Sequence, residues 1–553
     1  MPVINFSRSD LENLMGAKVP TETLRERLPM MGADLKFAEE GNDELSFEFF
    51  PDRPDLYSVE GIARALKAFL DIDPGLRVYT VGDSQVRVLV DPSVNVVRPY
   101  IWSAIVEGLV FDDPLIRSMM DLQEKLHLTI GRDRKKVAIG IHDMEAVEPP
   151  FTYKSVLPDE LTFFPLQGTR EMTPAEILES HDKGRAYAFV LNGKERYPLI
   201  VDKNGEVLSM PPIINGIATE VTEKTEDIFV DCTGTDLNAL KYSVNIITAA
   251  LADRGGKVLS VVIERDGMEL RAPDLEPRSM TLDVAHTNRW LGTALNAEEI
   301  AGCLGRLGFG ASVNDGALDV KVPAYRADIL HPVDLAEDVA IGHGYEAFGD
   351  FFPKETTFGV EDPLVSFASR VRPIMTGLGY FEVVTLSLSN SREQFTALGL
   401  DDSTEALRIQ NPVTEMHTLV RISLLPSLLG ILRKNKHREL PQRIFEIGDV
   451  VVNTANRKRL GGVAIHAKAS FTECKSLLLS LSAALGLTSE IAAAEHPAYV
   501  PGRCATIMAA TREVGIFGEV HPRTIESFEL KYPIVAFEMD LDAVHSILER
   551  RIE

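Results

Sequence analysis

The spacing of apolar residues changes repeatedly along this chain between a two-residue period and a helical period. The two-residue period predicts strands at Leu45–Phe50, Val86–Val90, Trp102–Phe111, Val137–Ile141, Ala186–Leu191, Leu199–Asp202, Ile228–Cys232, Arg278–Asp283, Leu318–Val322, Phe381–Ser389 and Arg443–Val450. The helical period predicts helices at Val59–Leu70, Asp113–Leu126, Leu237–Arg254 and Ser366–Leu378. Because strands and helices are intermixed throughout, we expect an α+β protein.

Turn and capping signals group these elements into four predicted domains. The 553 residues are too many for one core, and about three to five domains are expected. The predicted domains are residues 1–80, 85–265, 270–350 and 356–553. In the third, Asn296 and Glu299 fit a helix capping box, and Asp315-Gly316 is typical of a β-hairpin turn. Helices followed by a hairpin predict a small winged-helix-like domain there.

The segment Val322–Tyr345 concentrates candidate chemistry. Four carboxylates stand in it: Asp328, Asp334, Glu337 and Asp338. A helix with Asp334 as its N-cap would place the last three on one face. Mg²⁺ prefers carboxylate oxygens and would cancel their mutual repulsion. The pattern also fits a solvated acidic first turn that complements the helix dipole, and charge pattern alone favours this second interpretation.

Composition narrows the classes of protein that fit. The net charge of −25 argues against a general nucleic-acid coat, but it allows local basic patches. The four cysteines are scattered singly, so neither a disulfide framework nor a zinc site is expected. The first residues, MPVINFSRSDLENL, lack the apolar core of a signal peptide. No apolar run reaches about 18 residues, so we expect a cytoplasmic protein with no membrane segment.

Several long strings resemble one known family. They are PDRPDLYSVEGIAR from Pro51, LSMPPIIN from Leu208, DIFVDCTGTD from Asp227, VPAYRADILHPVDLAEDVAIGHGY from Val322, NPVTEMHTLVRISLLPSLL from Asn411 and RIFEIGDV from Arg443. Together they touch all four predicted domains, and they resemble the β subunit of phenylalanyl-tRNA synthetases of archaeal and eukaryotic type. We find no oligonucleotide-binding insert near residue 40 and no anticodon-binding extension after Glu553, which fits this shorter type.

The resemblance implies that residues 85–265 are an editing domain, which hydrolyses tyrosine wrongly attached to tRNA(Phe). Its pocket must tell tyrosine from phenylalanine by one hydroxyl, and a hydrogen-bonding pocket selects strongly on that basis. The residues carried over to this pocket are Leu199, Ser209, Asn215, Asp231 and Thr233. Asp231 is the natural acceptor of a phenol O–H. No Cys/His or Ser/His nucleophile pair is visible nearby, so we expect a positioned water, helped by a tRNA hydroxyl.

The resemblance also implies a metal site and a partner chain. It assigns Mg²⁺ to Asp328, Asp334, Glu337 and Asp338, close to an α subunit. Two α and two β chains would form a heterotetramer that binds tRNA(Phe), L-phenylalanine and ATP. Residues 356–553 resemble the antiparallel class II synthetase fold, but the arginines that clamp ATP are not recognisable. We therefore expect a non-catalytic C-terminal domain, with aminoacylation on the α subunit.

Other interpretations stay open from the sequence. The chain could be a scaffold or tRNA-binding subunit without active editing, or a freestanding hydrolase of mischarged tRNA. The basic runs Arg132–Lys136 and Arg433–Arg438 fit either phosphate contacts or the solvated ends of secondary-structure elements. Thr233–Asp236 fits either ligand contacts or a turn in which Asp236 caps the next helix.

Overall fold

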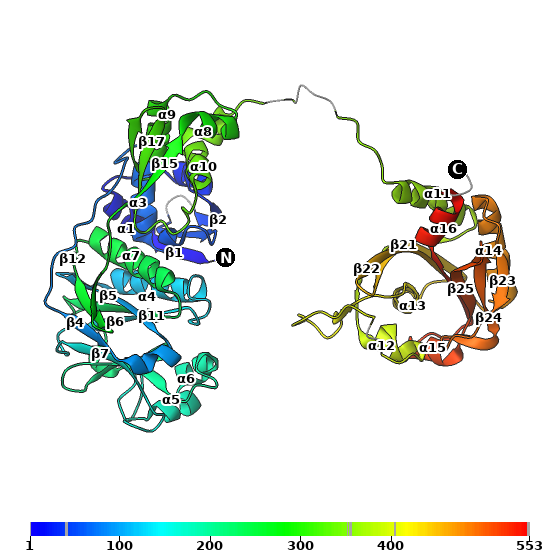
Figure 1. The fold of residues 1–553 in the computed structure, drawn as a ribbon, viewed down its shortest axis with the longest axis horizontal. Helices are drawn as coiled ribbons and strands as arrows, with labels where there is room; N and C mark the ends of the chain where they lie inside the picture. Colours follow the sequence, from blue (N-terminus) through cyan, green and yellow to red (C-terminus); the bar gives the residue numbers. More distant parts are fainter. Residues whose placement is uncertain (1, 39–41, 351, 353–356, 403–404, 550–553) are drawn as a thin grey trace. The chain divides into compact units, whose positions relative to one another are not determined.

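The chain divides into two compact units, Met1–Phe351 and Phe352–Glu553 (Figure 1). The structure is a computed structural model, and it describes residues 2–38, 42–350, 352, 357–402 and 405–549. The position near residue 40, where the sequence predicts no insert, lies outside the described residues.

The N-terminal region holds a three-stranded antiparallel sheet in the order β1-β3-β2. Its elements are β1 (Val3–Ser7), α1 (Arg8–Met15), α2 (Thr21–Met30), β2 (Ala33–Ala38), β3 (Glu44–Phe49) and α3 (Val59–Phe69). Leu45, Phe47 and Phe49 alternate along β3 and bury one face, as the two-residue period predicts. Helix α3 is capped by Ser58, whose hydroxyl accepts the N–H of Gly61, and it packs against α1.

The middle of the first unit contains two further sheets. A seven-stranded sheet has the order β10-β9-β8-β7-β4-β13-β14, and a four-stranded sheet has the order β12-β5-β11-β6. The strands are β4 (Arg87–Val90), β5 (Tyr100–Glu107), β6 (Val137–Asp143), β7 (Phe151–Val156), β8 (Tyr197–Val201), β9 (Val207–Met210), β10 (Ile214–Asn215), β11 (Ile228–Gly234), β12 (Lys257–Leu259), β13 (Val261–Arg265) and β14 (Met268–Ala272). The helices are α4 (Asp113–Leu128), α5 (Pro174–Ser180), α6 (Asp182–Tyr187) and α7 (Leu237–Asp253).

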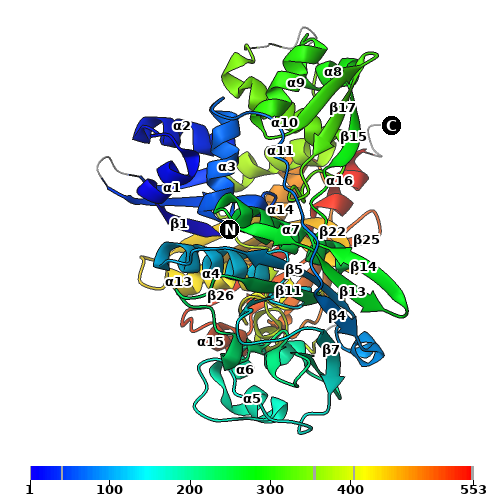
Figure 2. The same cartoon turned by 90° about the vertical axis from the view of Figure 1, so that its left-hand side faces the viewer.

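Helices α4 and α7 pack against each other and against the four-stranded sheet (Figures 1 and 2). Asp236 caps α7, because its carboxylate accepts the N–H of Ala239 at 3.2 Å, which is one of the two interpretations that the sequence left open. Strand β11 lies between β5 and β6, so its residues are buried along its whole length. Phe229 on β11 packs against Phe151 on β7, with ring centroids 4.6 Å apart, and this contact joins the two sheets.

The last region of the first unit has a three-stranded antiparallel sheet in the order β15-β17-β16. Its elements are β15 (Arg278–Asp283), α8 (Val284–Leu291), α9 (Ala297–Arg306), β16 (Gly310–Asn314), β17 (Ala317–Val322) and α10 (Pro332–His343). The capping box of Asn296 and Glu299 is confirmed, since each side chain accepts the backbone N–H of the other, at 2.9 and 2.7 Å. The predicted order of helices followed by a β-hairpin is also confirmed.

The three regions of the first unit share one hydrophobic core. A single cluster of buried apolar side chains includes Leu11 of α1, Leu66 of α3, Ile247 of α7 and Leu304 of α9. The first three predicted domains therefore pack into one unit, and the boundaries between them stay a prediction.

The second unit is built on a seven-stranded sheet in the order β18-β21-β22-β26-β25-β24-β23, antiparallel except between β18 and β21. The strands are β18 (Phe381–Glu382), β21 (Gln442–Val452), β22 (Ala455–Ile465), β23 (Glu490–Ala493), β24 (Tyr499–Ala509), β25 (Arg512–Val520) and β26 (Ile534–Asp540). The main helices are α11 (Pro363–Gly377), α13 (Leu425–Lys434), α14 (Phe471–Leu485) and α16 (Leu541–Glu549). Phe445 faces the core with α11, α14 and α16, whereas its neighbour Ile444 faces the core with α13.

Three predictions about local structure are wrong. Ala186–Leu191 lies in α6 and a 3₁₀ turn at Ala188–Val190, because short apolar runs do not distinguish strand from helix. Phe381–Ser389 is a strand only at its ends, in β18 and in β19 (Leu388–Ser389). Helix α10 is capped by His331, so Asp334 is its third residue rather than its N-cap.

Two further findings concern membrane-spanning helices and the state of the cysteines. In the part of the chain that the structure describes, no helix combines the length and the apolar character needed to cross a membrane. All four cysteines are buried and unpaired.

Candidate functional site

A cavity of about 330 Å³ opens in the first unit between α4, β6, β11 and the turn that joins β9 to β10. Its walls are mostly apolar, and they include Ile116 and Met119 of α4 and Ile139 of β6. Polar groups reach it from Ser209, Asn215, Asp231, Glu124, Arg134 and Thr219. Three of the five predicted pocket residues, Ser209, Asn215 and Asp231, are therefore brought together at one cavity.

Ser209 and Asn215 lie opposite each other on β9 and β10. The tight turn between them contains Pro211 and Pro212. The Ser209 hydroxyl is buried, and it has no hydrogen-bond partner among the described residues. Such an orphaned polar group beside a cavity indicates a place where a ligand group can bind.

Asp231 is held by a histidine that sequence reasoning missed. Nε2 of His142 lies 2.8 Å from Oδ2 of Asp231, and both side chains are buried. Nδ1 of the same ring lies 2.8 Å from the hydroxyl of Thr219. In the register of β6 and β11, Asp231 pairs with Gly140, two residues before His142 on the same strand. The available signal was therefore the pairing of two predicted strands, Val137–Ile141 and Ile228–Cys232.

Leu199 and Thr233 do not line the cavity. Leu199 is fully buried in a separate apolar cluster with Ile177 and Val201. The Thr233 hydroxyl accepts the Nε–H of Arg98 at 3.0 Å, and Nη2 of Arg98 donates to the Thr233 carbonyl at 2.6 Å. Burial lowers the pKa of Arg98 to about 10. These two residues pack within the domain outside the cavity, and their role in a ligand pocket stays a prediction.

The basic run Arg132–Lys136 contributes one residue to the cavity wall. Arg132, Asp133 and Arg134 all have positive φ, at 46°, 57° and 63°, a conformation that costs non-glycine residues energy. This left-handed turn directs the Arg134 guanidinium inward, where Nη1 donates to the carbonyls of Pro212 and Ile213 at 3.2 and 3.1 Å. The Arg134 side chain is thus neither solvated at the tip of a turn nor available to contact a phosphate group.

Arg134 is also paired with a carboxylate at the cavity. Its Nη2 lies 2.6 Å from Glu124, and its guanidinium stacks 4.0 Å above the ring of Tyr187. The hydrogen bond from His127, together with the charge of Arg134, holds the pKa of Glu124 down at about 2. Glu124 therefore stays ionised at neutral pH and fixes the guanidinium beside the cavity.

The four carboxylates of the segment Val322–Tyr345 do not converge. Arg326 donates from Nη2 to both Asp328 and Asp338, at 2.6 Å each. Asp334 instead accepts the backbone N–H groups of Leu330 and His331, at 2.7 Å each. Burial raises the pKa of Asp338 although Arg326 opposes that shift.

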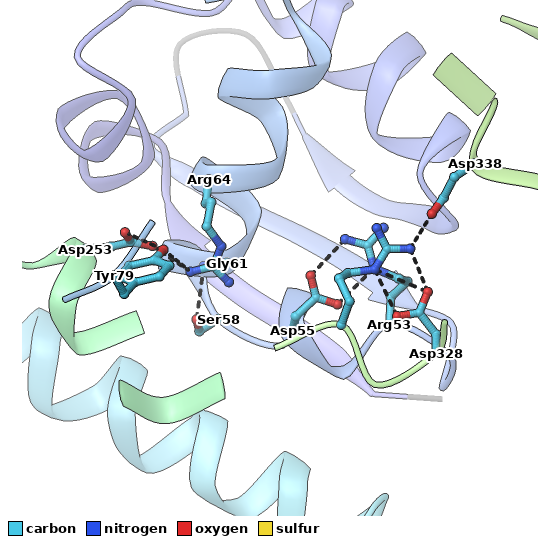
Figure 3. Close-up of polar contacts among 10 residues, drawn as sticks. Arg53, Asp55, Ser58, Gly61, Arg64, Tyr79, Asp253, Asp328 and Asp338 are labelled. Atoms are coloured by element: carbon cyan, nitrogen blue, oxygen red, sulfur yellow. Dashed lines mark hydrogen bonds and ion pairs between the residues drawn. The ribbon is translucent and has the colours of Figure 1, made fainter. Parts of the chain in front are cut away.

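A second set of ion pairs lies close to these residues in the close-up of Figure 3. Arg53 and Asp55, from the string PDRPDLYSVEGIAR, form two hydrogen bonds of 2.8 Å (Figure 3). Arg64, from the same string, pairs at 2.6 Å with Asp253 of α7, which also accepts from Tyr79 at 3.0 Å. The string is therefore a corner of the fold whose charges are neutralised within the unit.

These contacts test whether magnesium fits the segment. Glu337 is exposed, Asp334 is engaged by backbone, and Asp328 and Asp338 share a guanidinium. Among the described residues no group of three or more His, Cys, Asp and Glu side chains is placed to hold a metal ion. As arranged in this chain by itself, the four carboxylates do not fit a magnesium ion, and the magnesium site stays a prediction.

In the second unit, buried charges are neutralised internally. Arg421 donates to Glu446 at 2.9 Å, to the Thr385 hydroxyl at 2.6 Å and to the Asp449 carbonyl at 2.9 Å. Both side chains of the Arg421–Glu446 ion pair are 2% exposed, so these groups hold the segment that precedes α13 against β21. The basic run Arg433–Arg438 lies at the end of α13, and its contact with tRNA stays a prediction.

Comparisons with known proteins identify the segments that carry these features. The model of the phenylalanyl tRNA synthetase beta chain CLM domain matches residues 350–541, that of the tRNA synthetase B5 domain matches 280–345, and that of the B3/4 domain matches 112–250. The cavity residues that we name lie within the last of these ranges.

Whole-length relatives and a solved structure agree with these matches. The chain is 45% identical to the phenylalanine–tRNA ligase beta subunit of Archaeoglobus fulgidus over 98% of both chains. It is 44% identical to that of Methanothrix thermoacetophila, over 98% of this chain and 100% of the relative. The crystal structure of an N-terminal fragment of the phenylalanyl-tRNA synthetase beta subunit from Pyrococcus horikoshii superposes with a TM-score of 0.60 at 40% identity, and it covers 62% of this chain and all of that one.

Proposed function

Because this chain belongs to the family of phenylalanine–tRNA ligase beta subunits, we propose that it works with an alpha subunit to attach L-phenylalanine to tRNA(Phe). ATP would be used on the alpha subunit, and two chains of each kind would assemble in the cytoplasm. The cavity of this chain would hydrolyse tyrosine that has been attached to tRNA(Phe) by mistake.

The observation that carries the editing proposal is a carboxylate in a mostly apolar cavity. The volume of about 330 Å³ lies in the range of ~300–1,000 Å³ of small-molecule sites. Apolar walls suit an aromatic ring, and Asp231 with Ser209 offers partners for a phenol hydroxyl. Phenylalanine would leave these buried groups unpaired, and such sites reject the analogue that lacks the hydroxyl by about 10⁴- to 10⁵-fold.

Hydrolysis itself needs a nucleophile that the cavity side chains do not supply in an activated form. His142 is occupied on both nitrogens, by Asp231 and by Thr219, and it is not hydrogen-bonded to a serine or a cysteine. We propose that a water positioned at the cavity, with help from a tRNA hydroxyl, attacks the ester. The chain would supply binding and orientation.

Contacts within the second unit support the proposal that the alpha subunit, and not this chain, uses ATP to activate phenylalanine. Its buried arginine Arg421 has donors on all three nitrogens engaged within the unit. Arg503, on the surface, pairs with Glu519 at 2.9 Å. Arginines committed in this way are not available to clamp ATP phosphates, so this unit would pack against the partner subunit that performs the activation.

The proposal is tested by deacylation of tyrosyl-tRNA(Phe) with the complex of this chain and its alpha subunit. Asp231→Ala is expected to lower kcat/KM for hydrolysis by about 100-fold or more, because the phenol loses its acceptor. Asp227→Ala is the matched control, since Asp227 lies just before β11 and accepts the N–H of Gly108 outside the cavity. If the wild-type complex leaves tyrosyl-tRNA(Phe) intact, editing is excluded and a scaffolding or tRNA-binding role remains.

A further inference from the structure

Three side chains from three separate segments form a continuous chain of hydrogen bonds behind the cavity. Thr219 ends the 3₁₀ turn Ile217–Thr219, His142 lies on β6, and Asp231 lies on β11. Their contacts are both 2.8 Å long. Thr219 and Asp231 line the cavity, whereas the imidazole is wholly buried between them.

The chemistry of the imidazole determines which atom donates in each of these two hydrogen bonds. A neutral imidazole has one donor and one acceptor nitrogen, and a carboxylate can only accept. Nε2–H therefore donates to Oδ2 of Asp231, and Nδ1 is left as the acceptor of the Thr219 hydroxyl. At 2.8 Å this is the shortest contact of that hydroxyl, which also lies 3.3 and 3.4 Å from the carbonyls of Gly216 and Leu208. This assignment follows from the partners of each atom. One carboxylate oxygen is then used, and the other is left for the cavity.

Room for the pair depends on the absence of a side chain at position 140. Gly140 lies directly across from Asp231 in the sheet. A Cβ at that position would collide with Oδ2 of Asp231 and would lie 2.6 Å from Nε2 of His142. The Asp231 carboxylate thus occupies space that any other residue at position 140 would fill, and His142 fixes its rotation there.

We propose that His142, supported by Thr219, is the positioning residue that sets the preference of this cavity for a phenol over a phenyl ring. It holds Asp231 with one oxygen turned toward the cavity, where that oxygen accepts the substrate hydroxyl. The inference rests on the proposed editing function and adds a residue on which its specificity depends. An alternative role, in which His142 only satisfies a buried carboxylate, would affect both aromatic substrates equally.

The experiment compares two substrates across matched variants of the full complex. His142→Phe removes both hydrogen bonds, whereas His142→Gln retains a side-chain N–H that can reach Asp231. For His142→Phe we expect kcat/KM on tyrosyl-tRNA(Phe) to fall by about 10- to 100-fold, as loss of a charge-assisted hydrogen bond implies. Hydrolysis of phenylalanyl-tRNA(Phe) should change far less, and His142→Gln should recover most of the selectivity.

Thr219→Val provides a second variant in case His142→Phe does not fold. It keeps the shape of the side chain and removes the hydroxyl that holds Nδ1, so a several-fold loss of selectivity for tyrosine is expected. Thr248→Val is its control, because Thr248 is equally buried but donates to the Val244 carbonyl within α7. Equal losses on both substrates, or unchanged selectivity in both cavity variants, would overturn the proposal.

Binding of free amino acids separates this inference from the editing reaction. Titration calorimetry of the full chain without its alpha subunit, so that the proposed phenylalanine-activating site is absent, measures the preference of the cavity for L-tyrosine or L-phenylalanine without hydrolysis. A tyrosine preference that His142→Phe abolishes supports the positioning role even if wild-type hydrolysis is absent, in which case only the proposed function fails. A preference that persists in His142→Phe overturns the inference even if editing is active.

Discussion

Arg254, directly after α7, donates to both carboxylate oxygens of Asp10 on α1, at 2.7 and 2.6 Å, although the two residues are 244 positions apart. The same guanidinium donates to Glu60 of α3 at 2.7 Å. Burial alone would lower the pKa of Arg254, but the hydrogen bonds and charges of Asp10 and Glu60 raise it above its ordinary value. One arginine therefore links the end of α7 to α1 and α3 of the N-terminal region.

Removal of this arginine is expected to destabilise the first unit. Arg254→Ala leaves Glu60, which is 3% exposed, without its cationic partner, although the Ser118 hydroxyl still donates to it. Breaking such a buried ion pair costs roughly 3 kcal/mol. Urea unfolding of the full chain measures the change. Arg117→Ala is the control, because its pair with Asp113 is exposed and is worth less than ~1 kcal/mol. Equal effects of the two variants would contradict the role of Arg254 as a buried link.

Gly140→Ala is expected to disturb the cavity, because Gly140 on β6 lies directly across from Asp231 on β11. The added methyl group would displace Asp231 or His142, and forced overpacking of this kind costs about 1–3 kcal/mol. Deacylation of tyrosyl-tRNA(Phe) should fall together with stability. Gly302→Ala is the matched control, since Gly302 is exposed within α9 with open space around its Cα. That variant should gain about 0.5–1 kcal/mol through helix propensity.

Glu124 is expected to make the first unit sensitive to acid. Its pKa in the folded chain is about 2, against an ordinary value of 4.5, so its ionised form stabilises the fold at neutral pH. This contribution is complete above pH 4.5 and is lost as the pH falls from 4.5 toward 2. Because the side chain is 42% exposed, solvent screening reduces the effect to about 1 kcal/mol.

The test of Glu124 compares unfolding free energies at pH 7 and pH 3. Glu124→Gln should be less stable than wild type at pH 7, and the difference should shrink at pH 3. Glu195→Gln, at an exposed position before β8, should show no such dependence. A Glu124→Gln penalty that grows in acid would mean that the carboxylate is not held in its ionised form.

Magnesium is expected to bind weakly to the chain by itself. Arg326 already neutralises Asp328 and Asp338, and Asp334 is engaged by backbone N–H groups. Titration of Mg²⁺ into the isolated chain should therefore show no saturable tight site at this segment. A tight site that disappears in the double variant Asp334→Ala, Glu337→Ala would show that the carboxylates rearrange around the ion. The same titration with the alpha subunit present tests the site that the family resemblance implies.

Local signals in the sequence were sufficient for much of the fold. The caps at Asn296 and Asp236 and the strand that contains Asp231 are confirmed because each depends on residues close together in the chain. The strand predicted at Ala186–Leu191 is wrong because an apolar run of that length fits either period. There the helix α6 instead presents Tyr187 to Arg134, a contact between distant segments.

The cavity was only partly predictable, because it also depends on contacts between segments that are distant in the chain. Asp231 and Ser209 are recognisable from their strings, but His142 acquires its role from the pairing of β6 with β11, 89 residues away. Leu199 lies outside the cavity because its side chain packs into another apolar cluster, and its role in the pocket stays a prediction. The family strings identify the region, while strand register decides which side chains reach the cavity.

The common core of the first unit also limits how its parts can be exchanged. Leu66 of α3, Ile247 of α7 and Leu304 of α9 pack into one interior although they come from three predicted domains. A graft of residues 112–250 onto another protein would expose the apolar surface that Leu66 and Leu304 cover in this unit. Evolution and protein engineering alike would therefore have to move this segment together with its flanking regions.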